Sequence, residues 1–523
     1  MAKPKPLLLI ILDGFGISLE KEGNPVYEAK KPTLDEIERN FPFTTLQASG
    51  VAVGLPWGEA GNSEVGHLTM GAGRVIYHHL PRIINAISDG SFFKNPAFIG
   101  AAEHVRKNKS RLHIAGLVSS GSVHSYIDHL YALLDFTKKE KLEEVHLHIF
   151  TDGKDAPPQE GVKFIELLEE RIKKEWPQTH LATVVGRFYA MDRDEKWERI
   201  QTSYGLLTGG KGEKITSIPE YIRTQYKKDL TDEFIGAAVA DGNGIIKDGD
   251  ALIFFNFRED SMRELAHAFA DEDFDKFPRK KSKNLFLVTM TEYQKDLKAH
   301  AAFEPLDIGW PLARILGEAG LRHLHIAETE KYAHVTYFLN GGTEKLFPGE
   351  ERILIPSITA AHFDEVPEMR AKEITAKILE YFDTYDVIIA NFANADLVGH
   401  SGNFQAAIRA VEILDGALQQ IMNAVLASDG AALITGDHGN IELKRNVITG
   451  EKLTEHSLNA VPLYLIGRKF RLTKQRSESE REKQKTEAGG MLTDIAPTIL
   501  ELLGLKKPAE MTGKDLLKTL LGQ

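Results

Sequence analysis

The chain has 523 residues, 42% of them hydrophobic and 27% charged, which is the composition of a globular protein of about two or three domains. Its net charge of −11 argues against general nucleic-acid binding, because that relies on a basic surface. An anionic ligand would therefore need a locally basic pocket. The absence of cysteine excludes disulfides and thiolate metal sites and leaves histidine, carboxylate and hydroxyl oxygen as metal ligands.

The first predicted element is the apolar run over residues 7–12, which we expect to form a buried strand that ends at Asp13. Six apolar residues are far too few to span a membrane, which takes about 20. The run is also short for the apolar part of a signal peptide. We therefore expect a cytoplasmic protein without a membrane partner.

Short apolar runs recur along the chain and alternate with segments of helical period. We predict further strands over residues 112–118, 145–150, 181–185, 251–255, 285–288, 387–390, 431–434 and 461–466. Residues 162–176 place apolar side chains at the spacing of one helix face. The alternation predicts an α/β fold of mostly parallel sheets with helices on both faces. In open sheets of this kind, ligands gather at the carboxyl ends of the strands.

Acidic, imidazole and hydroxyl side chains stand where several predicted strands stop. Three carboxylates, three imidazoles and one serine suit two neighbouring divalent ions that activate a hydroxyl nucleophile. The candidate ligands are Asp13, Ser63, Asp396, His400, Asp437, His438 and His456. Singly, each of these residues also fits a turn, a helix cap or a surface position. Their shared place at the edge of one predicted sheet favours a metal site.

Ser63 lies in the segment GNSEVGH, which predicts the start of a helix. One interpretation is a helix cap with an acidic residue in the first turn. The other interpretation uses the same geometry for chemistry. A serine hydroxyl beside a cation can ionise near neutral pH and attack phosphorus, and the backbone N–H groups of a helix N-terminus attract the anion.

The candidate ligands also predict the domain layout, because Asp13 lies near the start of the chain and Asp396 in its last third. If they share one site, residues 1–78 and 311–523 form one discontinuous metal-binding domain. Residues 79–310 then form an inserted substrate-binding domain, since insertions at loops are well tolerated.

Two kinds of connecting segment complete this layout. We expect hinges near residues 73–81 and 303–311, where the inserted domain begins and ends. Residues 468–487 are highly charged and almost without apolar side chains. This composition predicts a solvated loop or an exposed helical hairpin.

The middle of the chain supplies cations at predicted strand ends, in the segments SVHS, DGKD, GRFYAMDRD and FNFR. Guanidinium groups bind phosphate and carboxylate through paired hydrogen bonds. The candidate substrate-binding residues are His124, Lys154, Asp155, Arg187, Arg193, Arg258 and Arg263. Singly, each is more often surface charge than a ligand. Together they describe a pocket for a small molecule with a phosphate and a carboxylate, beside an acid–base group.

In their order along the chain, these segments resemble the cofactor-independent (2,3-bisphosphoglycerate-independent) phosphoglycerate mutases of the alkaline phosphatase superfamily. The resemblance runs nearly end to end and rests on LDGFG, GNSEVGH, GAGR, SGSVHS, DGKDAPP, GRFYAMDRD, FNFR, AETEKYAHVTYFLNGG, NADLVGH, TGDHGN and EHSLNAVP. It implies an alkaline-phosphatase-like sheet with an inserted second α/β domain. It also implies the interconversion of 3-phosphoglycerate and 2-phosphoglycerate without 2,3-bisphosphoglycerate.

The resemblance further implies roles for individual residues. One divalent ion would be bound by Asp396, His400 and His456, and the other by Asp13, Ser63, Asp437 and His438. Manganese is the first expectation, with zinc, cobalt and magnesium as alternatives. Ser63 would carry the phosphoryl group as a phosphoserine, stabilised by Lys331, which also lines the phosphoglycerate site. Asp155 or His124 would handle the protons of the glycerate hydroxyls.

The expected partner is a small phosphorylated acid, and a monomer is the expectation for the family. Closure of the inserted domain would keep water from the phosphoserine. Two alternatives stay open. One is a metal-dependent phosphohydrolase or sugar-phosphate mutase of the same superfamily, and the other is a non-catalytic binding protein.

The chain departs from the family pattern at three places. Lys154 and Ser261 stand where arginine is usual, and the segment PSITAAHFD over residues 356–364 is altered. We expect these changes to affect substrate affinity and orientation more than the metal chemistry. An arginine restored at position 261 is expected to lower the Michaelis constant or leave it unchanged.

Overall fold

The structure, a computed structural model, describes residues 3–360 and 362–522, so one residue of the segment PSITAAHFD, Ala361, lies outside it. The chain divides into two compact units. Unit 1 is formed by Met1–His78 and Leu306–Gln523, and unit 2 by His79–Pro305. The chain thus leaves unit 1 once and returns to it, so unit 2 is an insertion.

Unit 1 is built on an eight-stranded sheet with the order β12-β11-β13-β1-β14-β15-β2-β16. Strand β15 runs against its neighbours β14 and β2, and the other pairs are parallel. The strands are β1 (Leu7–Leu12), β2 (Phe43–Gln47), β11 (His323–Glu328), β12 (Glu350–Ile355), β13 (Val387–Phe392), β14 (Ala431–Thr435), β15 (Val461–Ile466) and β16 (Ala488–Met491).

Strand β1 lies inside this sheet, between β13 and β14, and every one of its side chains is buried. Leu8 and Ile10 pack into the core on one face of the sheet, whereas Leu9 and Ile11 pack into the core on the other. A strand covered on both faces needs apolar side chains at every position, which explains the unbroken run in the sequence.

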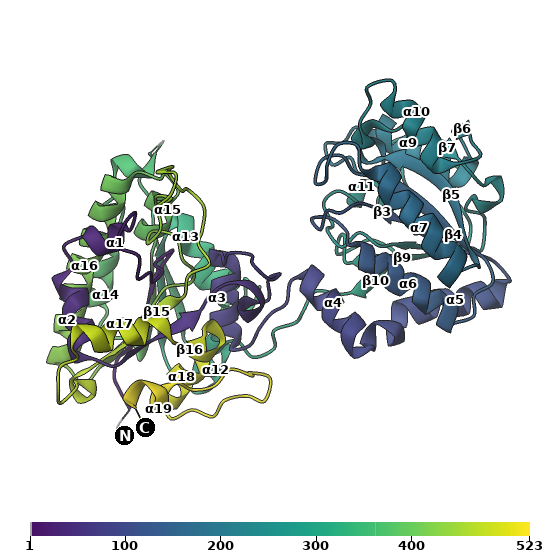
Figure 1. Cartoon of the computed structure of the whole chain (residues 1–523). Helices are drawn as coiled ribbons and strands as arrows, with labels where there is room; N and C mark the ends of the chain where they lie inside the picture. The colour runs from purple at the N-terminus through teal and green to yellow at the C-terminus, as the bar shows by residue number, and fades with distance from the viewer. Residues whose placement is uncertain (1–2, 361, 523) are drawn as a thin grey trace. The chain divides into compact units, whose positions relative to one another are not determined.

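Helices cover both faces of the sheet in unit 1 (Figure 1). One core is closed by α2 (Pro32–Asn40), α14 (Ala371–Glu380) and α16 (Phe404–Ala427), and the other by α3 (Ser63–Ala72), α12 (Leu312–Glu318) and α18 (Ile495–Leu502). The shorter or peripheral helices are α1 (Pro25–Glu28), α13 (Thr329–Ala333), α15 (Asn394–Gly399), α17 (Glu478–Thr486) and α19 (Leu517–Leu521).

Unit 2 has its own eight-stranded sheet, with the order β10-β9-β8-β3-β4-β5-β7-β6. All neighbouring pairs are parallel except β5 and β7. The strands are β3 (Leu112–Leu117), β4 (Val145–Thr151), β5 (Thr179–Gly186), β6 (Glu213–Lys214), β7 (Ala238–Val239), β8 (Ala251–Phe254), β9 (Phe286–Thr291) and β10 (His300–Phe303).

The sheet of unit 2 also separates two apolar cores, and Figure 1 shows helices packed along this sheet. One lies beneath α5 (Pro96–Asn108), α6 (Ile127–Lys139), α7 (Gly161–Glu175) and α10 (Ile218–Tyr226), and the other beneath α9 (Trp197–Gly209) and α11 (Arg263–Ala270). Helices α4 (His79–Asp89) and α8 (Arg187–Ala190) complete the unit.

The predicted α/β class with mostly parallel sheets is confirmed. Every strand predicted from an apolar run is present, with small differences at the ends, and the predicted helix over residues 162–176 forms α7. In the part of the chain that the structure describes, no helix has the length and apolar content needed to cross a membrane.

Several strands were not predicted, and β11 and β12 show why. Strand β11 reads HLHIAE, and the imidazoles of His323 and His325 are fully buried although histidine carries no apolar signal. Strand β12 reads EERILI and is only partly buried. The charged stretch over residues 468–487 contains the single exposed helix α17, which begins with a capping box between Ser477 and Glu480 and is not a hairpin.

Close packing of α3 gives a test of the fold. A Cβ atom added at Gly71 would lie 1.9 Å from the carbonyl oxygen of Leu339. The substitution Gly71→Ala would therefore force the backbone of α3 away from that of Leu339. We expect this substitution to destabilise unit 1 by about 1–3 kcal/mol, the usual effect of overpacking. Calorimetry or thermal fluorescence should show a lower unfolding temperature.

The matched control is Gly416→Ala, in the middle of α16. Gly416 is exposed, and a Cβ atom there meets nothing within 4 Å. Alanine is favoured over glycine inside a helix by about 1 kcal/mol, so this variant should be more stable than the wild type. An unchanged or raised unfolding temperature for Gly71→Ala would contradict the packing described for α3.

Candidate functional site

The carboxyl edge of the unit 1 sheet gathers the functional side chains predicted for this domain. Strands β11, β13, β1 and β14 are neighbours and run in parallel, so their carboxyl ends meet at one edge. Lys331, Asp396, Asp13 and Asp437 follow these four strands in that order. Each is at most 4% exposed.

A glycine turn brings the segments of this edge together. Gly14 follows Asp13, has a φ of +70°, and donates its N–H to Asp437 Oδ1 at 3.0 Å. A Cβ atom at Gly14 would lie 2.7 Å from the Cα of Asp396. The left-handed conformation and the close approach both require glycine at this turn.

Ser63 is the first residue of α3, whose N-terminus is capped by the Asn62 side chain. Its Oγ lies 2.9 Å from Asp13 Oδ1 and 3.0 Å from His438 Nε2. Lys331 Nζ donates to the same oxygen at 2.6 Å. A buried hydroxyl thus has a carboxylate, an imidazole and an ammonium group within hydrogen-bonding distance.

Lys331 is an ammonium group held among carboxylates. Besides Ser63, it donates to Asp13 Oδ1 at 2.5 Å and to Asp396 Oδ2 at 2.7 Å. Burial alone would lower the pKa of Lys331, but the charges of Asp13 and Asp396 outweigh burial and raise this pKa above its usual value. Lys331 in turn outweighs the burial of both carboxyl groups, so their pKa values lie below the usual range.

Asp396, His400 and His456 form the first group that fits a cation. The Nδ1 atoms of the two histidines lie 2.9 Å from Thr454 O and 2.7 Å from Gly61 O, so each Nδ1 carries the proton. In the neutral rings the lone pairs are then on Nε2. These two Nε2 atoms face each other at 3.1 Å, and each lies 3.3 Å from Asp396 Oδ1. Two lone pairs and a carboxylate oxygen that converge are the donor set of a divalent ion.

A second group lies beside the first and includes Asp13, Asp437 and His438. Ligand atoms of Asp13, Asp396 and His438 lie within 4.8 Å of one another. Asp437 Oδ1 accepts from Gly14 N and His438 N, but its buried Oδ2 has no hydrogen-bond partner among the described residues. An unpaired carboxylate oxygen in the interior is costly unless a cation binds it.

The charge balance of this edge also fits bound cations. Asp13, Asp396 and Asp437 bring three buried negative charges, whereas Lys331 brings one positive charge. Burial disfavours the protonated form of His438, yet the nearby carboxylates raise its pKa to about 9. The site therefore attracts positive charge strongly enough to protonate a fully buried imidazole, and the residues present fit divalent ions.

Two buried side chains of this edge were not predicted, His67 and Asn391. Asn391 Nδ2 donates to Asp13 Oδ2 at 2.7 Å and lies 3.0 Å from His67 Nε2. His67 Nδ1 lies 2.8 Å from Ser63 O and 3.3 Å from Asp437 Oδ2. Asn391 thus orients the carboxylate of Asp13, and His67, whose Nδ1 donates to Ser63 O, accepts from Asn391 through Nε2. The available signal was spacing, since His67 follows Ser63 by one helical turn.

Glu442 and Lys444 form a further unpredicted layer behind the site. The fully buried Glu442 accepts from Gly16 N at 3.0 Å, Asn440 N at 2.9 Å and Asn459 Nδ2 at 2.9 Å, and so joins three segments. Lys444 donates to Asn440 Oδ1, and Asn440 Nδ2 donates to Asp396 Oδ1 at 2.7 Å. No pattern in the sequence separates these two charged residues from ordinary surface charge.

The carboxyl edge of the unit 2 sheet holds a polar cavity of about 200 Å³. Strands β8, β3, β4 and β5 are parallel neighbours, and the segments that follow them line this cavity. Six of the predicted substrate-binding residues are in its wall, namely His124, Lys154, Asp155, Arg187, Arg193 and Arg258.

Arg187 and His124 are held in place by acidic and hydroxyl groups. Arg187 donates to Asp152 Oδ1 at 2.7 Å and to Asp155 Oδ2 at 2.5 Å. His124 Nε2 lies 3.5 Å from Asp155 Oδ2, and its Nδ1 lies 2.9 Å from Ser261 Oγ. Burial and the Arg187 charge lower the pKa of His124 to about 4, so the imidazole is neutral near pH 7 and can accept or donate a proton.

Lys154 and Ser261, which stand where arginine is usual in the family, have different surroundings in this cavity. Both residues are in the cavity wall, but Ser261 is only 2% exposed and its hydroxyl hydrogen-bonds to His124. Arg263, which was also predicted to bind the substrate, lines the neighbouring cavity and donates to Tyr293 O at 3.0 Å. Arg263 is therefore placed differently from the other predicted arginines.

Comparison with known proteins identifies the family. A family model described as the BPG-independent PGAM N-terminus matches residues 83–295, within unit 2. The 2,3-bisphosphoglycerate-independent phosphoglycerate mutases of Moorella thermoacetica and Clostridium beijerinckii are each 46% identical to this chain, over 522 and 520 residues, and cover 99% and 98% of it and 99% of their own length. A crystal structure of Leishmania mexicana phosphoglycerate mutase at low cobalt concentration is 30% identical, with a TM-score of 0.57 over 98% of both chains. The chain belongs to the family of 2,3-bisphosphoglycerate-independent phosphoglycerate mutases.

Proposed function

We propose that the protein interconverts 3-phosphoglycerate and 2-phosphoglycerate through a phosphoserine on Ser63. The observation that carries this proposal is the environment of the Ser63 hydroxyl, which has Asp13, His438 and Lys331 within 3.0 Å. The relatives that share this chain's full length carry the name of this mutase. 2,3-Bisphosphoglycerate is not needed, because the serine itself accepts the phosphoryl group.

In the first half of the reaction, Ser63 Oγ forms a bond to phosphorus while the bond from phosphorus to the glycerate oxygen breaks. In the second half, the other glycerate hydroxyl attacks the phosphoserine and Ser63 Oγ leaves. Lys331 donates to this oxygen at 2.6 Å, so its charge offsets the negative charge that develops there in both halves.

Unit 2 would bind the acid in its cationic cavity. Arg187, Arg193 and Arg258 supply planar groups for carboxylate or phosphate, and Lys154 supplies a further charge. Each glycerate hydroxyl gains a proton when phosphate leaves it and loses one when it attacks. His124 and Asp155, which lie 3.5 Å apart, are the groups proposed for these transfers.

Two divalent ions are proposed as cofactors. Asp396, His400 and His456 would hold one ion, and Asp13, Ser63, Asp437 and His438 the other. When bound, such ions supply the positive charge that lowers the pKa of a serine hydroxyl and stabilises phosphoryl oxygens. Mixed oxygen and nitrogen donors suit manganese, zinc or cobalt, and manganese is put first, with magnesium as a further alternative, on the family resemblance. The crystal structure of the Leishmania relative is described as one at low cobalt concentration.

We further propose that the protein acts as a cytoplasmic monomer on this small molecule, with neither nucleic acid nor a membrane as partner. The net charge of −11 argues against a nucleic-acid partner, and the family relation supports the monomer and the compartment. Size-exclusion chromatography with light scattering tests the monomer, and a dimer at micromolar concentration would contradict it.

Replacing Ser63 tests the phosphoryl acceptor. Ser63→Ala should lower kcat for the conversion of 3-phosphoglycerate by a factor of about 10³ or more, as expected when the nucleophile of a covalent mechanism is lost. The matched control, Ser477→Ala at the exposed N-cap of α17, should keep its activity. An assay coupled to enolase measures both variants.

The same assay separates the proposed function from its nearest alternative. The wild-type enzyme should form 2-phosphoglycerate without added 2,3-bisphosphoglycerate. If 3-phosphoglycerate yields inorganic phosphate and no 2-phosphoglycerate, the protein is a phosphohydrolase and the proposal fails. Full activity in Ser63→Ala would show that the covalent step is wrong.

Removal of divalent ions tests the cofactor. Protein stripped with a chelator should lose activity and show a lower unfolding temperature, because the buried carboxylates lose the cations that offset their charge. Calorimetric titration should then show two ions bound per chain, with manganese restoring activity best. Unchanged activity in the stripped protein would contradict the metal site.

The position of Ser261 tests how the cavity of unit 2 is built. Because Ser261 is buried against His124, an arginine there would displace the imidazole. We therefore expect Ser261→Arg to raise KM by a factor of about ten or more, contrary to the expectation from the sequence, since one lost polar contact has an effect of that order. Ser261→Ala, which removes only the hydroxyl, should change KM less. A lower KM for Ser261→Arg would restore the first expectation.

A further inference from the structure

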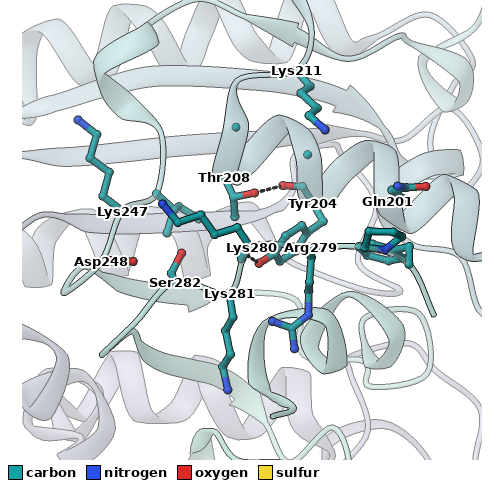
Figure 2. Close-up of a pocket in the computed structure, with 15 residues that line it drawn as sticks. Gln201, Tyr204, Thr208, Lys211, Lys247, Asp248, Arg279, Lys280, Lys281 and Ser282 are labelled. Atoms are coloured by element: carbon teal, nitrogen blue, oxygen red, sulfur yellow. Dashed lines mark hydrogen bonds between the residues drawn. The ribbon is translucent and has the colours of Figure 1, made fainter. Parts of the chain in front are cut away.

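Unit 2 contains another cavity that the proposed reaction does not use. It has a volume of about 480 Å³, compared with about 200 Å³ for the arginine-lined cavity, and the two share no lining residue (Figure 2). Its wall is formed by residues of α9 from Gln201 onward, by Lys211 just after this helix, by residues 246–248 and by residues 277–282. The size is that of a site for a small organic molecule.

The lining of this cavity is strongly basic in a chain of net charge −11. The wall contains one carboxylate, that of Asp248, and five cationic side chains, those of Lys211, Lys247, Arg279, Lys280 and Lys281. A cavity with one sign of charge concentrates ligands of the opposite sign. The wall therefore favours an anion.

Two of these cations are already engaged by the protein. Lys281 Nζ donates to Glu272 Oε1 at 2.7 Å and to Ala270 O at 3.0 Å. Arg279 donates to Asp271 O and lies over aromatic rings, 5.0 Å from the ring centre of Phe274. In Figure 2 both side chains extend to the same side of the view. Their role is to fix the segment over residues 277–282.

The other three cations are free to bind a ligand. The ammonium groups of Lys211, Lys247 and Lys280 make no hydrogen bond or ion pair within residues 3–360 and 362–522. Figure 2 shows them extending from three different segments of the cavity wall. Three unpaired ammonium groups around one cavity match a ligand with several negative charges.

The frame that carries these lysines is held firmly. Tyr204 Oη in α9 donates to the carbonyl oxygen of Lys280 at 2.9 Å. Phe277 is only 6% exposed and packs against Tyr204, with ring centres 5.8 Å apart. The segment that bears Lys280 is thus fixed against α9 before any ligand arrives, which reduces the entropy lost on binding.

Ser282 adds a hydroxyl group to the cavity wall. Its side chain is 9% exposed, and its hydroxyl makes no hydrogen bond within the described part of the chain. The hydroxyl is therefore available to donate to an oxygen of a bound ligand. Ile246, Phe277 and Pro278 add an apolar wall to the same cavity.

We propose that this cavity binds an organic polyphosphate, of the class of a nucleoside triphosphate. The three free ammonium groups and the Ser282 hydroxyl would bind the phosphate chain, and the apolar wall would contact the organic part. This cavity shares no lining residue with the arginine-lined cavity, so the proposal does not depend on the mutase reaction.

The test uses the full chain and ATP as the probe, titrated calorimetrically without added divalent ions and with saturating 3-phosphoglycerate to fill the arginine-lined cavity. The triple variant K211Q/K247Q/K280Q should bind ATP at least about tenfold more weakly than the wild type, since a single charge-assisted hydrogen bond contributes on that order. It should keep its unfolding temperature and its mutase activity, because none of the three lysines lines the other cavity.

The matched control is K107Q/K141Q/K174Q, which removes the same charge from exposed lysines elsewhere on unit 2. This variant should bind ATP like the wild type. The proposal is overturned if the wild type does not bind ATP, if the first triple variant binds it as tightly as the wild type, or if both triple variants weaken it equally. Equal affinity for inorganic tripolyphosphate would overturn the role given to the apolar wall.

Discussion

The structure of unit 1 depends on the balance of charge around Lys331. Its ammonium group contacts Asp13, Asp396 and Ser63 in a region closed to water. Removing one partner from a buried charge pair costs about 3–5 kcal/mol, whereas an exposed pair contributes only about 0–1 kcal/mol. Together with Asp437 there are three carboxylates for one ammonium group. The arrangement that places the charge of Lys331 next to Ser63 therefore also favours the binding of further cations. Reactivity and metal binding follow from one constraint.

The parallel sheet makes this concentration of charge possible. Four neighbouring strands end at one edge, and each delivers a polar side chain there without crossing the apolar cores. Gly14 lets the turn after β1 approach Asp396, and Gly71 lets α3 approach Leu339. Unit 2 repeats the principle with arginine and lysine side chains, among which Arg187 pairs with Asp152 and Asp155. Both sheets thus gather charged side chains at the carboxyl ends of parallel strands.

The sequence predicted the elements that are apolar throughout, and with them the side chains at their ends. Strand β1 and Asp13 are the clearest case, because a strand buried on both faces has an unbroken apolar run. Strand β11 was not predicted, because two of its buried side chains are histidines, which are not apolar and which make hydrogen bonds in the interior. His325 Nδ1, for example, lies 2.6 Å from Val335 O.

Contacts between distant segments could not be predicted in the same way. Glu442 accepts a hydrogen bond from Gly16, which lies 426 residues away along the chain. Nothing in the local sequence predicts that Glu442 is buried. Ser261 was read as a lost arginine, whereas in three dimensions it orients His124. Arg263 follows Ser261 closely along the chain but faces another cavity. Residue type and spacing indicate a site, but side-chain direction depends on the packed fold.

Phosphorylation of Ser63 during turnover can be measured by rapid quenching followed by peptide mass spectrometry. Enzyme loaded with divalent ions is mixed with 3-phosphoglycerate, quenched within one turnover by a chelator and a denaturant at neutral pH, where phosphoserine and phosphohistidine both survive, and digested. We expect phosphate on the peptide that contains Ser63 and on no histidine. Turnover without a phosphorylated peptide, or with the phosphate on another residue, would contradict it.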